Sequence, residues 1–91
     1  MHDVIDNRER SRFELAVDGH TAFAAYTIAG DVITFTHTVV PPALQGQGIA
    51  SRLIAAALAE VRARGQKLIP ECSFVQAYLE KHPQDRDLIA G

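Results

Sequence analysis

The middle of the chain contains a glycine-punctuated stretch with the residue types of a phosphate-binding loop. It follows a β-branched segment that ends at Val40, and the Pro-Pro pair after that residue stops any strand because proline has no amide hydrogen for a β-ladder. Gly46 and Gly48 leave the backbone open to a ligand and permit a positive φ angle. Residues 49–61 then carry apolar side chains at helical spacing, which is typical of an amphipathic helix.

The start of this helix contains no carboxylate. First turns usually hold Asp or Glu, which complement the positive end of the helix dipole and bind the free N–H groups. Here the loop offers only Gln and Gly, and Arg52 follows one turn into the helix. Such a start is open to an external anion, most naturally a phosphate. The residues expected to contact it are Gln45, Gly46, Gln47, Gly48, Ile49, Ala50, Ser51 and Arg52.

Two well-known glycine motifs fit this stretch poorly. A P-loop needs a Lys-Ser or Lys-Thr pair after its second glycine, and none is present. The dinucleotide fingerprint needs a third glycine where this chain has Ser51, and it needs a βαβ unit, whereas the preceding strands look antiparallel. A plain tight turn before a helix remains the alternative interpretation.

Segment 45–50 resembles the coenzyme A pyrophosphate loop of the GCN5-related N-acetyltransferase superfamily, whose motif is Gln/Arg-x-x-Gly-x-Gly/Ala. Two further blocks are similar to the small single-domain branch of that superfamily. One is 37–41, before the loop; the other is 70–83, which contains Tyr78-Leu79 and His82-Pro83. Members of that branch are about as long as this chain, so the resemblance covers nearly all of it.

The resemblance implies acetyl-CoA as the cofactor and an exposed amine as the acceptor, such as a protein lysine or N-terminus. It implies that the end of the third strand splays from the strand at Leu68 and Ile69, and that the pantetheine arm lies in the gap. The third-strand residues at this gap are Thr38, Val39 and Val40. Full-size members carry two further helices for which the chain has no room before Gln45, so we expect an open acceptor side.

Three side chains are candidates for catalysis. By the resemblance, Tyr78 is the candidate acid; a half-buried tyrosine with an ordinary hydrogen bond is the alternative. His37 is the candidate base because histidine titrates near neutral pH, although a strand histidine is often only packed. Cys72 is either a nucleophile for an acyl-cysteine route or a small buried hydrophobe, and direct transfer is the favoured route. Val39 stands where the small family commonly has Glu, which removes one candidate base.

Alternating apolar residues before the loop predict an antiparallel meander of three strands joined by short turns. The strands are expected at 12–17, 21–28 and 32–40. The third strand is expected to place His37 on the same face as Ile33 and Phe35.

After the loop, the pattern predicts a helix over 48–64 that ends at Gly65. A strand over 67–69 should lie parallel to the third strand because a helical crossover precedes it. Ser73 is expected to cap a last helix that Pro83 terminates. The predicted fold is therefore α+β (α/β), in the order β-β-β-α-β-α, and corresponds to a truncated acetyltransferase fold.

The composition fits one domain over 1–91, with 47% apolar and 22% charged residues. Segment 1–10 is expected to be flexible, and Leu88 and Ile89 are expected to pack back onto the sheet. The net charge of −2 argues against nucleic-acid binding, and no apolar stretch is long enough for a membrane span. The polar N-terminus does not resemble a signal peptide, and a single cysteine excludes an internal disulfide, which indicates a cytoplasmic protein. We expect a monomer or a weak homodimer. No histidine has a partner at metal-ligand spacing, so no metal site is predicted.

Three functions remain open at this point. The leading one is an acetyl-CoA-dependent N-acetyltransferase that transfers the acetyl group directly to an exposed amine. The second is a coenzyme A or acyl-CoA binding module with little or no turnover, which Val39 favours. The third is a small adaptor in which the glycine loop is only a turn.

Overall fold

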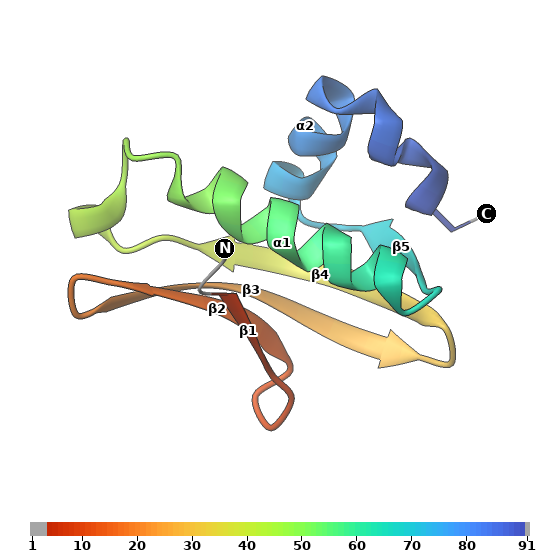
Figure 1. The fold of residues 1–91 in the computed structure, drawn as a ribbon, viewed down its shortest axis with the longest axis horizontal. Helices are drawn as coiled ribbons and strands as arrows, with labels where there is room; N and C mark the ends of the chain where they lie inside the picture. Colours follow the sequence, from red (N-terminus) through yellow and green to blue (C-terminus); the bar gives the residue numbers. More distant parts are fainter. Residues whose placement is uncertain (1–3, 91) are drawn as a thin grey trace.

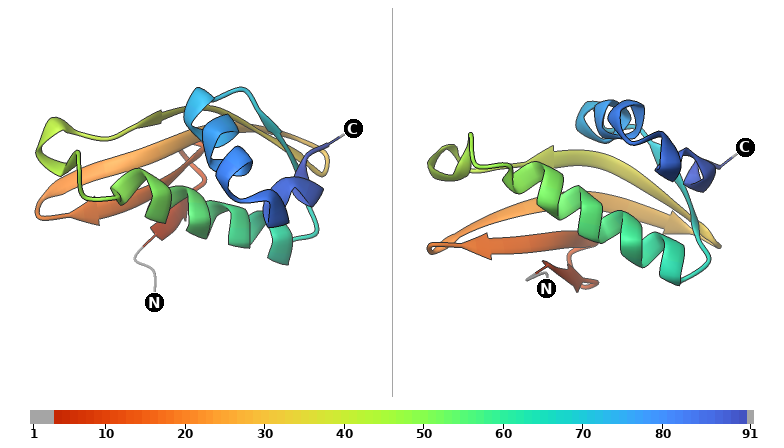
Figure 2. Two further views of the ribbon diagram at one scale, coloured as in Figure 1. Left: turned by 90° about the horizontal axis from the view of Figure 1, so that it is seen from above. Right: turned by 45° about the horizontal axis from the view of Figure 1, so that its top comes forward.

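The chain folds into one five-stranded sheet with its helices on one face (Figures 1 and 2). The computed structural model describes residues 4–90. The strands are β1 Val4–Asn7, β2 Arg12–Val17, β3 His20–Ala29, β4 Val32–Val39 and β5 Lys67–Pro70. The helices are α1 Ile49–Ala63 and α2 Ser73–Lys81, with the 3-10 turns η1 Pro42–Leu44 and η2 Pro83–Leu88.

The strands lie in sequence order, and the predicted pairing is confirmed. The first four form an antiparallel meander, and β5 pairs with β4 in parallel after the α1 crossover. The face under the helices supplies the core together with α1 and α2. Its largest fully buried side chains are Phe13, Phe35, Leu15, Ile33, Leu44, Leu53, Ile54, Leu68, Val61 and Val75. We call the other side of the sheet the open face, because no helix covers it (Figure 2).

Strand β1 was not expected, because segment 1–10 was predicted to be flexible. The structure instead pairs Val4–Asn7 antiparallel with β2. Only two residues of β1 are apolar, which gives too short a pattern to indicate a strand. Tertiary contacts compensate for this weak pattern: Asp6 accepts a hydrogen bond from Tyr26 and forms an ion pair with Arg64 at 3.0 Å. Residues 1–3 lie outside the described part.

A β-bulge near the end of β4 changes which side chains face the helices. Tyr26 pairs with Phe35, but its neighbour Ala25 pairs with His37, so Thr36 is an extra residue in β4. Directly opposed residues share a face, and an extra residue therefore reverses the alternation beyond it. His37 consequently lies on the open face, and the prediction that it shares a face with Ile33 and Phe35 is wrong.

The helix boundaries agree closely with the predicted ones. Gly65 follows α1 with φ +70°, and Glu60 and Arg64, four residues apart, form an ion pair at 3.1 Å. The cap of α2 differs, because Cys72 occupies the N-cap position and no side chain caps the helix. Within residues 4–90, none of the helices has both the length and the apolarity to cross a membrane.

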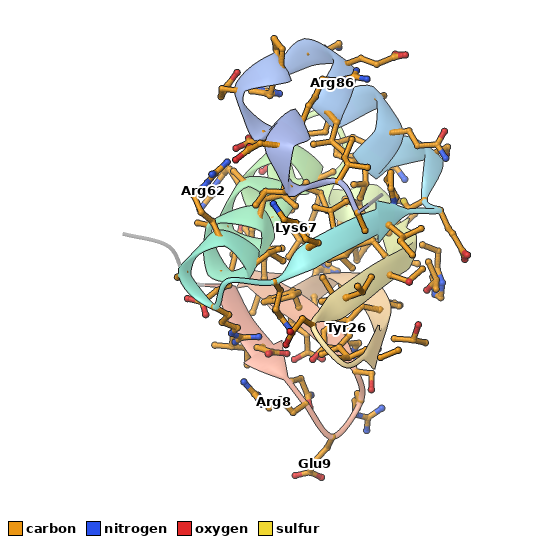
Figure 3. All side chains as sticks on the ribbon, turned by 90° about the vertical axis from the view of Figure 1, so that its right-hand side faces the viewer. Arg8, Glu9, Tyr26, Arg62, Lys67 and Arg86 are labelled. Carbon is orange, nitrogen blue, oxygen red and sulfur yellow. The ribbon has the colours of Figure 1, made fainter. Side chains whose placement is uncertain are left out.

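The C-terminal segment packs back onto the sheet, as predicted. Leu88 is buried, and Ile89 forms a parallel bridge with Leu68 at the outer edge of β5. The side chains of Arg62 and Lys67 lie beside this segment (Figure 3).

The buried phenol of Tyr26 should make stability fall at alkaline pH. Burial, followed by the hydrogen bond to Asp6 and the charge of that carboxylate, raises the pKa of Tyr26 to about 12. An unfolded chain releases this proton near pH ~10, so its contribution is complete below that pH and is lost as the pH rises to about 12. The free energy of unfolding should fall by about 2 kcal/mol over this interval. Chemical denaturation of wild type and Tyr26→Phe measures it; equal slopes in the two proteins would contradict the assignment.

Candidate functional site

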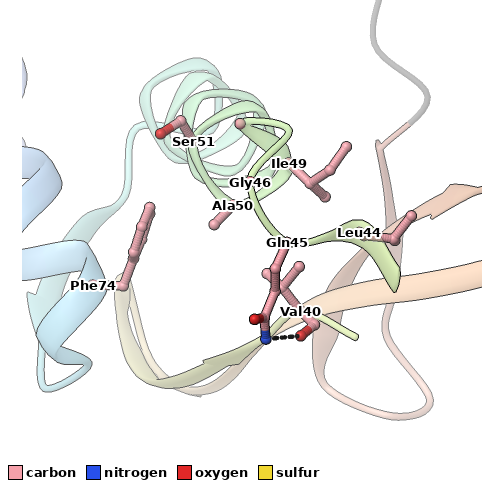
Figure 4. A pocket seen from close by; sticks show the side chains of 9 residues that line it. Val40, Leu44, Gln45, Gly46, Ile49, Ala50, Ser51 and Phe74 are labelled. Atoms are coloured by element: carbon pink, nitrogen blue, oxygen red, sulfur yellow. Dashed lines mark hydrogen bonds between the residues drawn. The ribbon is translucent and has the colours of Figure 1, made fainter. Parts of the chain in front are cut away.

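A cavity of about 240 Å³ lies between the glycine loop, the start of α1 and the first turn of α2 (Figure 4). It is lined by Val40, Leu44, Gln45, Gly46, Gly48, Ile49, Ala50, Ser51 and Phe74. The walls combine apolar side chains with bare loop backbone. The cavity therefore has a surface for an apolar group and a surface for a polar one.

The two loop glycines adopt left-handed backbone conformations. The φ angle is +82° at Gly46 and +72° at Gly48, a region that L side chains rarely occupy. A Cβ built on either residue would meet no other atom within 4 Å. Glycine is therefore required here by the backbone angle, while the space beside the loop stays open for a ligand.

The glutamine side chains of the loop bind the loop itself. Gln45 Nε2 donates to the carbonyl of Val40 at 3.1 Å, and Gln47 Nε2 donates to the carbonyl of Ala43 at 3.3 Å. These two bonds close the loop with side-chain donors and use none of its main-chain N–H groups. The Gln45 backbone amide donates to the carbonyl of Pro42, and the backbone amides of 46–51 are left available to an anion.

The start of α1 is uncapped. Gly48 is the N-cap residue, no side chain accepts from the first-turn amides, and the first turn contains no acidic residue. The unsatisfied amides and the dipole of a 15-residue helix therefore meet at the edge of the cavity. This arrangement favours a bound anion.

The sheet opens next to this cavity. The pairing of β4 with β5 ends at Phe35, whose carbonyl accepts from the amides of Glu71 and Cys72 at 3.1 and 2.9 Å. Beyond that point, residues 36–39 have no strand partner on the β5 side within the described chain. The bulge turns Thr38 to the helix side, where its Oγ1 lies 3.3 Å from the sulfur of Cys72. An extended ligand arm could therefore pair with the free edge of β4.

Tyr78 lies in α2, one turn after the cavity residue Phe74. Its side chain is 8% exposed, and its ring stacks on His82 with the centroids 3.9 Å apart. Burial is the main cause that raises the pKa of Tyr78, and the nearby carboxylate of Asp85 is the second. Like any phenol it is protonated at neutral pH, and burial moves its titration further into the alkaline range.

His37 is separated from the other two catalytic candidates. Tyr78 and Cys72 belong to the buried cluster on the helix side of the sheet. His37 is exposed on the open face, edge-on to Phe23 with the ring centroids 6.0 Å apart. The structure therefore brings Tyr78 and Cys72 to one side and leaves His37 on the other.

His82 is a neighbour of the site that the sequence analysis did not consider as functional. Its position four residues after Tyr78 is the spacing at which helical side chains meet, and that spacing could have identified it. No group of three or more His, Cys, Asp or Glu side chains within residues 4–90 could hold a metal ion.

A family model described as "GCN5-related N-acetyl-transferase" matches residues 12–88. The chain belongs to this family. It is 32% identical over 83 aligned positions to "Protein NATD1" of Mus musculus, covering 88% of this chain and 76% of that protein. The same protein of Homo sapiens is also 32% identical, with 88% and 74% covered.

A solved structure has the same fold. It is titled as the NMR solution structure of a GCN5-like putative N-acetyltransferase from Staphylococcus aureus. The TM-score is 0.74 at 27% identity, and the match covers 98% of this chain and 88% of that one. The predicted family and fold are thereby confirmed.

The residues of this GCN5-related chain fit coenzyme A. A diphosphate needs several free amides in a space without side chains, and the open cradle beside Gly46 and Gly48 supplies it. The apolar walls at Val40 and Phe74 suit an alkyl arm. The groups that suit coenzyme A lie in the glycine loop, at the start of α1 and along the free edge of β4.

The buried position of Cys72 predicts that its thiol reacts slowly with disulfide reagents. Only 6% of this residue is exposed, so a water-soluble disulfide reagent can reach the sulfur only after local opening. The native protein should therefore react much more slowly than the protein unfolded in denaturant. Because the chain has a single cysteine, the released chromophore reports this thiol alone. Equal rates for native and unfolded protein would show that the thiol is accessible.

Proposed function

We propose that this chain is an acetyl-CoA-dependent N-acetyltransferase that transfers the acetyl group directly to an exposed amine. The observation that carries the proposal is the meeting of the left-handed glycine loop, the uncapped start of α1 and an apolar cavity. A turn that only connected a strand to a helix would need neither an open cradle nor an uncapped start. The family membership supports the same reaction class.

Cofactor binding is assigned to three parts of the chain. The backbone amides of 46–51 would hold the diphosphate, while the Gln45 amide donates to the carbonyl of Pro42 at 3.3 Å. Arg52 adds a positive charge one turn into α1. The free edge of β4 at 38–40 would pair with the amide groups of the pantetheine arm. Phe74 and Val40 would contact its apolar part.

The reaction requires a neutral amine and a proton for the leaving sulfur. When bound, acetyl-CoA supplies an activated acyl group. An alkyl ammonium has a pKa of ~10.4, so releasing its proton at neutral pH costs about 4–5 kcal/mol. Fixed relative positions of the reacting groups can lower the barrier by roughly 7–11 kcal/mol. Positioning is therefore the larger contribution that this small chain can make.

Tyr78 is assigned as the acid. A phenol with its ordinary pKa of about 10 already holds its proton at neutral pH, and burial only raises the pKa of Tyr78 further. Its position one turn from the cavity wall is what supports the acid role. Cys72 is assigned a packing role beside Thr38, since its sulfur is buried and contacts the Thr38 hydroxyl. We therefore favour direct transfer to the amine over a route through an acyl-cysteine.

The amine is assigned to the open face of the sheet. His37 and Val39 point there from the free end of β4, and no helix covers them. An acceptor carried on a polypeptide, as a lysine or an N-terminus, suits such an uncovered site. His37 is the candidate base on this side, and bulk water is the alternative. The single thiol suits a reducing compartment, and we place the chain in the cytoplasm.

One observation favours a binding module without turnover. The free end of β4, residues 36–39, contains no carboxylate, and Val39 is 42% exposed on the open face. If His37 does not remove the amine proton, the chain would bind the cofactor and transfer the acetyl group slowly. Coenzyme A binding alone does not separate the two functions, but thiol release with an amine acceptor does.

The loop assignment predicts that Gly48→Asn abolishes most coenzyme A binding. Asn tolerates a left-handed backbone, so the loop should keep its shape while the new side chain fills the cradle. We expect the Kd to rise at least about tenfold, which corresponds to about 1.4 kcal/mol. The matched control is Gly65→Asn, which has φ +70° and open space at the other end of α1. Calorimetric titration measures both; unchanged affinity in Gly48→Asn would overturn the assignment.

The acid assignment predicts that Tyr78→Phe lowers turnover without weakening cofactor binding. Loss of a positioned acid commonly costs a factor of about 10²–10⁴ in rate, and the phenyl ring preserves the packing of α2. Thiol release with an amine panel gives kcat, and calorimetry gives the Kd. Tyr26→Phe is the control, because it removes the other tyrosine hydroxyl far from the cavity. An unchanged kcat in Tyr78→Phe would exclude the acid role.

A further inference from the structure

The aromatic pair at the end of α2 is not explained by packing of the core alone. The Tyr78 and His82 rings are nearly parallel, with an interplanar angle of 13° and centroids 3.9 Å apart. His82 Nδ1 donates to the main-chain carbonyl of Tyr78 at 2.9 Å, and the His82 amide donates to the same oxygen. The imidazole is thus fixed over the phenol by its own backbone and side chain.

The next residue explains why His82 leaves the helix at this point. Pro83 disfavours a helical conformation at the residue before it, and His82 has φ −127° and ψ 69°. The chain therefore turns after Lys81, and η2 begins with Pro83. The imidazole is directed back along α2 toward the preceding turn.

The parallel stack excludes a direct proton transfer between the two rings. Imidazole nitrogens donate and accept in the ring plane, and the phenol O–H also lies near its own ring plane. Two rings stacked face to face cannot align these groups. His82 therefore acts on Tyr78 by covering it and not by exchanging its proton.

We propose that His82 is a positioning residue for Tyr78: its imidazole shields one face of the phenol from water and holds the side chain one turn from the cavity wall at Phe74. The proposal deepens the acid role assigned above and rests on it for its catalytic consequence. Its structural part, the shielding, stands without that role.

Burial and charge around the pair support this inference. Tyr78 is 8% exposed, and burial is the first cause of its raised pKa. The charged group that acts on it from η2 is Asp85, which Arg62 of α1 binds at 3.2 Å. Arg62 also binds Asp87 at 2.9 Å, so one guanidinium pairs with both carboxylates of η2. Desolvation by the imidazole is then the contribution that one substitution can remove.

The decisive experiment follows the phenol directly. The chain has two tyrosines and no tryptophan, so a Tyr26→Phe background leaves Tyr78 as the only phenol. Its phenolate absorbance gives a titration midpoint, and circular dichroism at each pH checks that the fold persists. In this background, His82→Asn keeps a polar group but loses the ring, whereas His82→Phe keeps a ring and loses the nitrogen.

The two variants should change the titration midpoint of Tyr78 differently. We expect His82→Asn to move the midpoint down toward that of free tyrosine, and His82→Phe to leave it close to the parent value. His20→Asn is the control, since His20 begins β3 and is exposed. An unchanged midpoint in His82→Asn, or a fall only in His82→Phe, would overturn the shielding.

Turnover distinguishes this inference from the proposed function. With the otherwise native chain, His82→Asn should lower kcat about tenfold while the Kd for coenzyme A stays the same, and His82→Phe should retain most of the turnover. If the midpoint shifts as expected but Tyr78→Phe is fully active, the shielding stands and the acid role fails. If Tyr78→Phe is inactive and the midpoint does not shift, the positioning role of His82 fails.

Discussion

The bulge in β4 is the constraint on which the arrangement of the site depends. Directly opposed residues of an antiparallel pair share a face of the sheet. The extra residue Thr36 therefore reverses which side chains face the helices at the end of β4. Without it, His37 would face α1 and Thr38 would face away. With it, Thr38 meets Cys72 on the cavity side, and His37 lies on the open face beside Phe23. A single extra residue thus places Thr38 and His37 on opposite faces of the sheet.

The glycine loop after β4 is stabilised by contacts within the chain. Leu44 is buried in the core, and the side chains of Gln45 and Gln47 donate to the carbonyls of Val40 and Ala43. Each such hydrogen bond contributes about 1 kcal/mol net, and a buried leucine contributes roughly 1.5–3 kcal/mol. The Gln45 amide donates to the carbonyl of Pro42, whereas the amides of 46–51 have no hydrogen-bond partner within residues 4–90. A ligand that bound the loop would therefore not have to order it, because these contacts pre-organise it.

The sequence predicts the elements with strong periodicity and leaves out those set by tertiary contacts. Helix α1, its stop at Gly65, the meander and the parallel β5 all have local signals. Strand β1 does not, because its place is determined by contacts of Asp6 with Tyr26 and Arg64 from distant segments. The bulge has no residue signature in a Thr-rich strand, so the face of His37 was mispredicted. The loop was predictable because glycine spacing and a missing carboxylate are properties of the sequence itself, whereas the stack on Tyr78 needs the turn at Pro83.

The C-terminal segment decides whether α2 can hold Tyr78 in place. Arg62 reaches across to Asp85 and Asp87, and Lys67 donates to the carbonyl of Asp87 (Figure 3). These groups are largely exposed, and exposed ion pairs contribute little net stability because water screens them and ordering long side chains costs entropy. Burial of Leu88, roughly 1.5–3 kcal/mol, is the larger contribution, and the bridge of Ile89 to Leu68 fixes its register. The ion pairs therefore orient η2 more than they stabilise the fold. Segment η2 begins at Pro83, the residue that follows His82. The apolar contacts of Leu88 and Ile89 thus anchor the far end of η2, whose first residue, Pro83, follows His82.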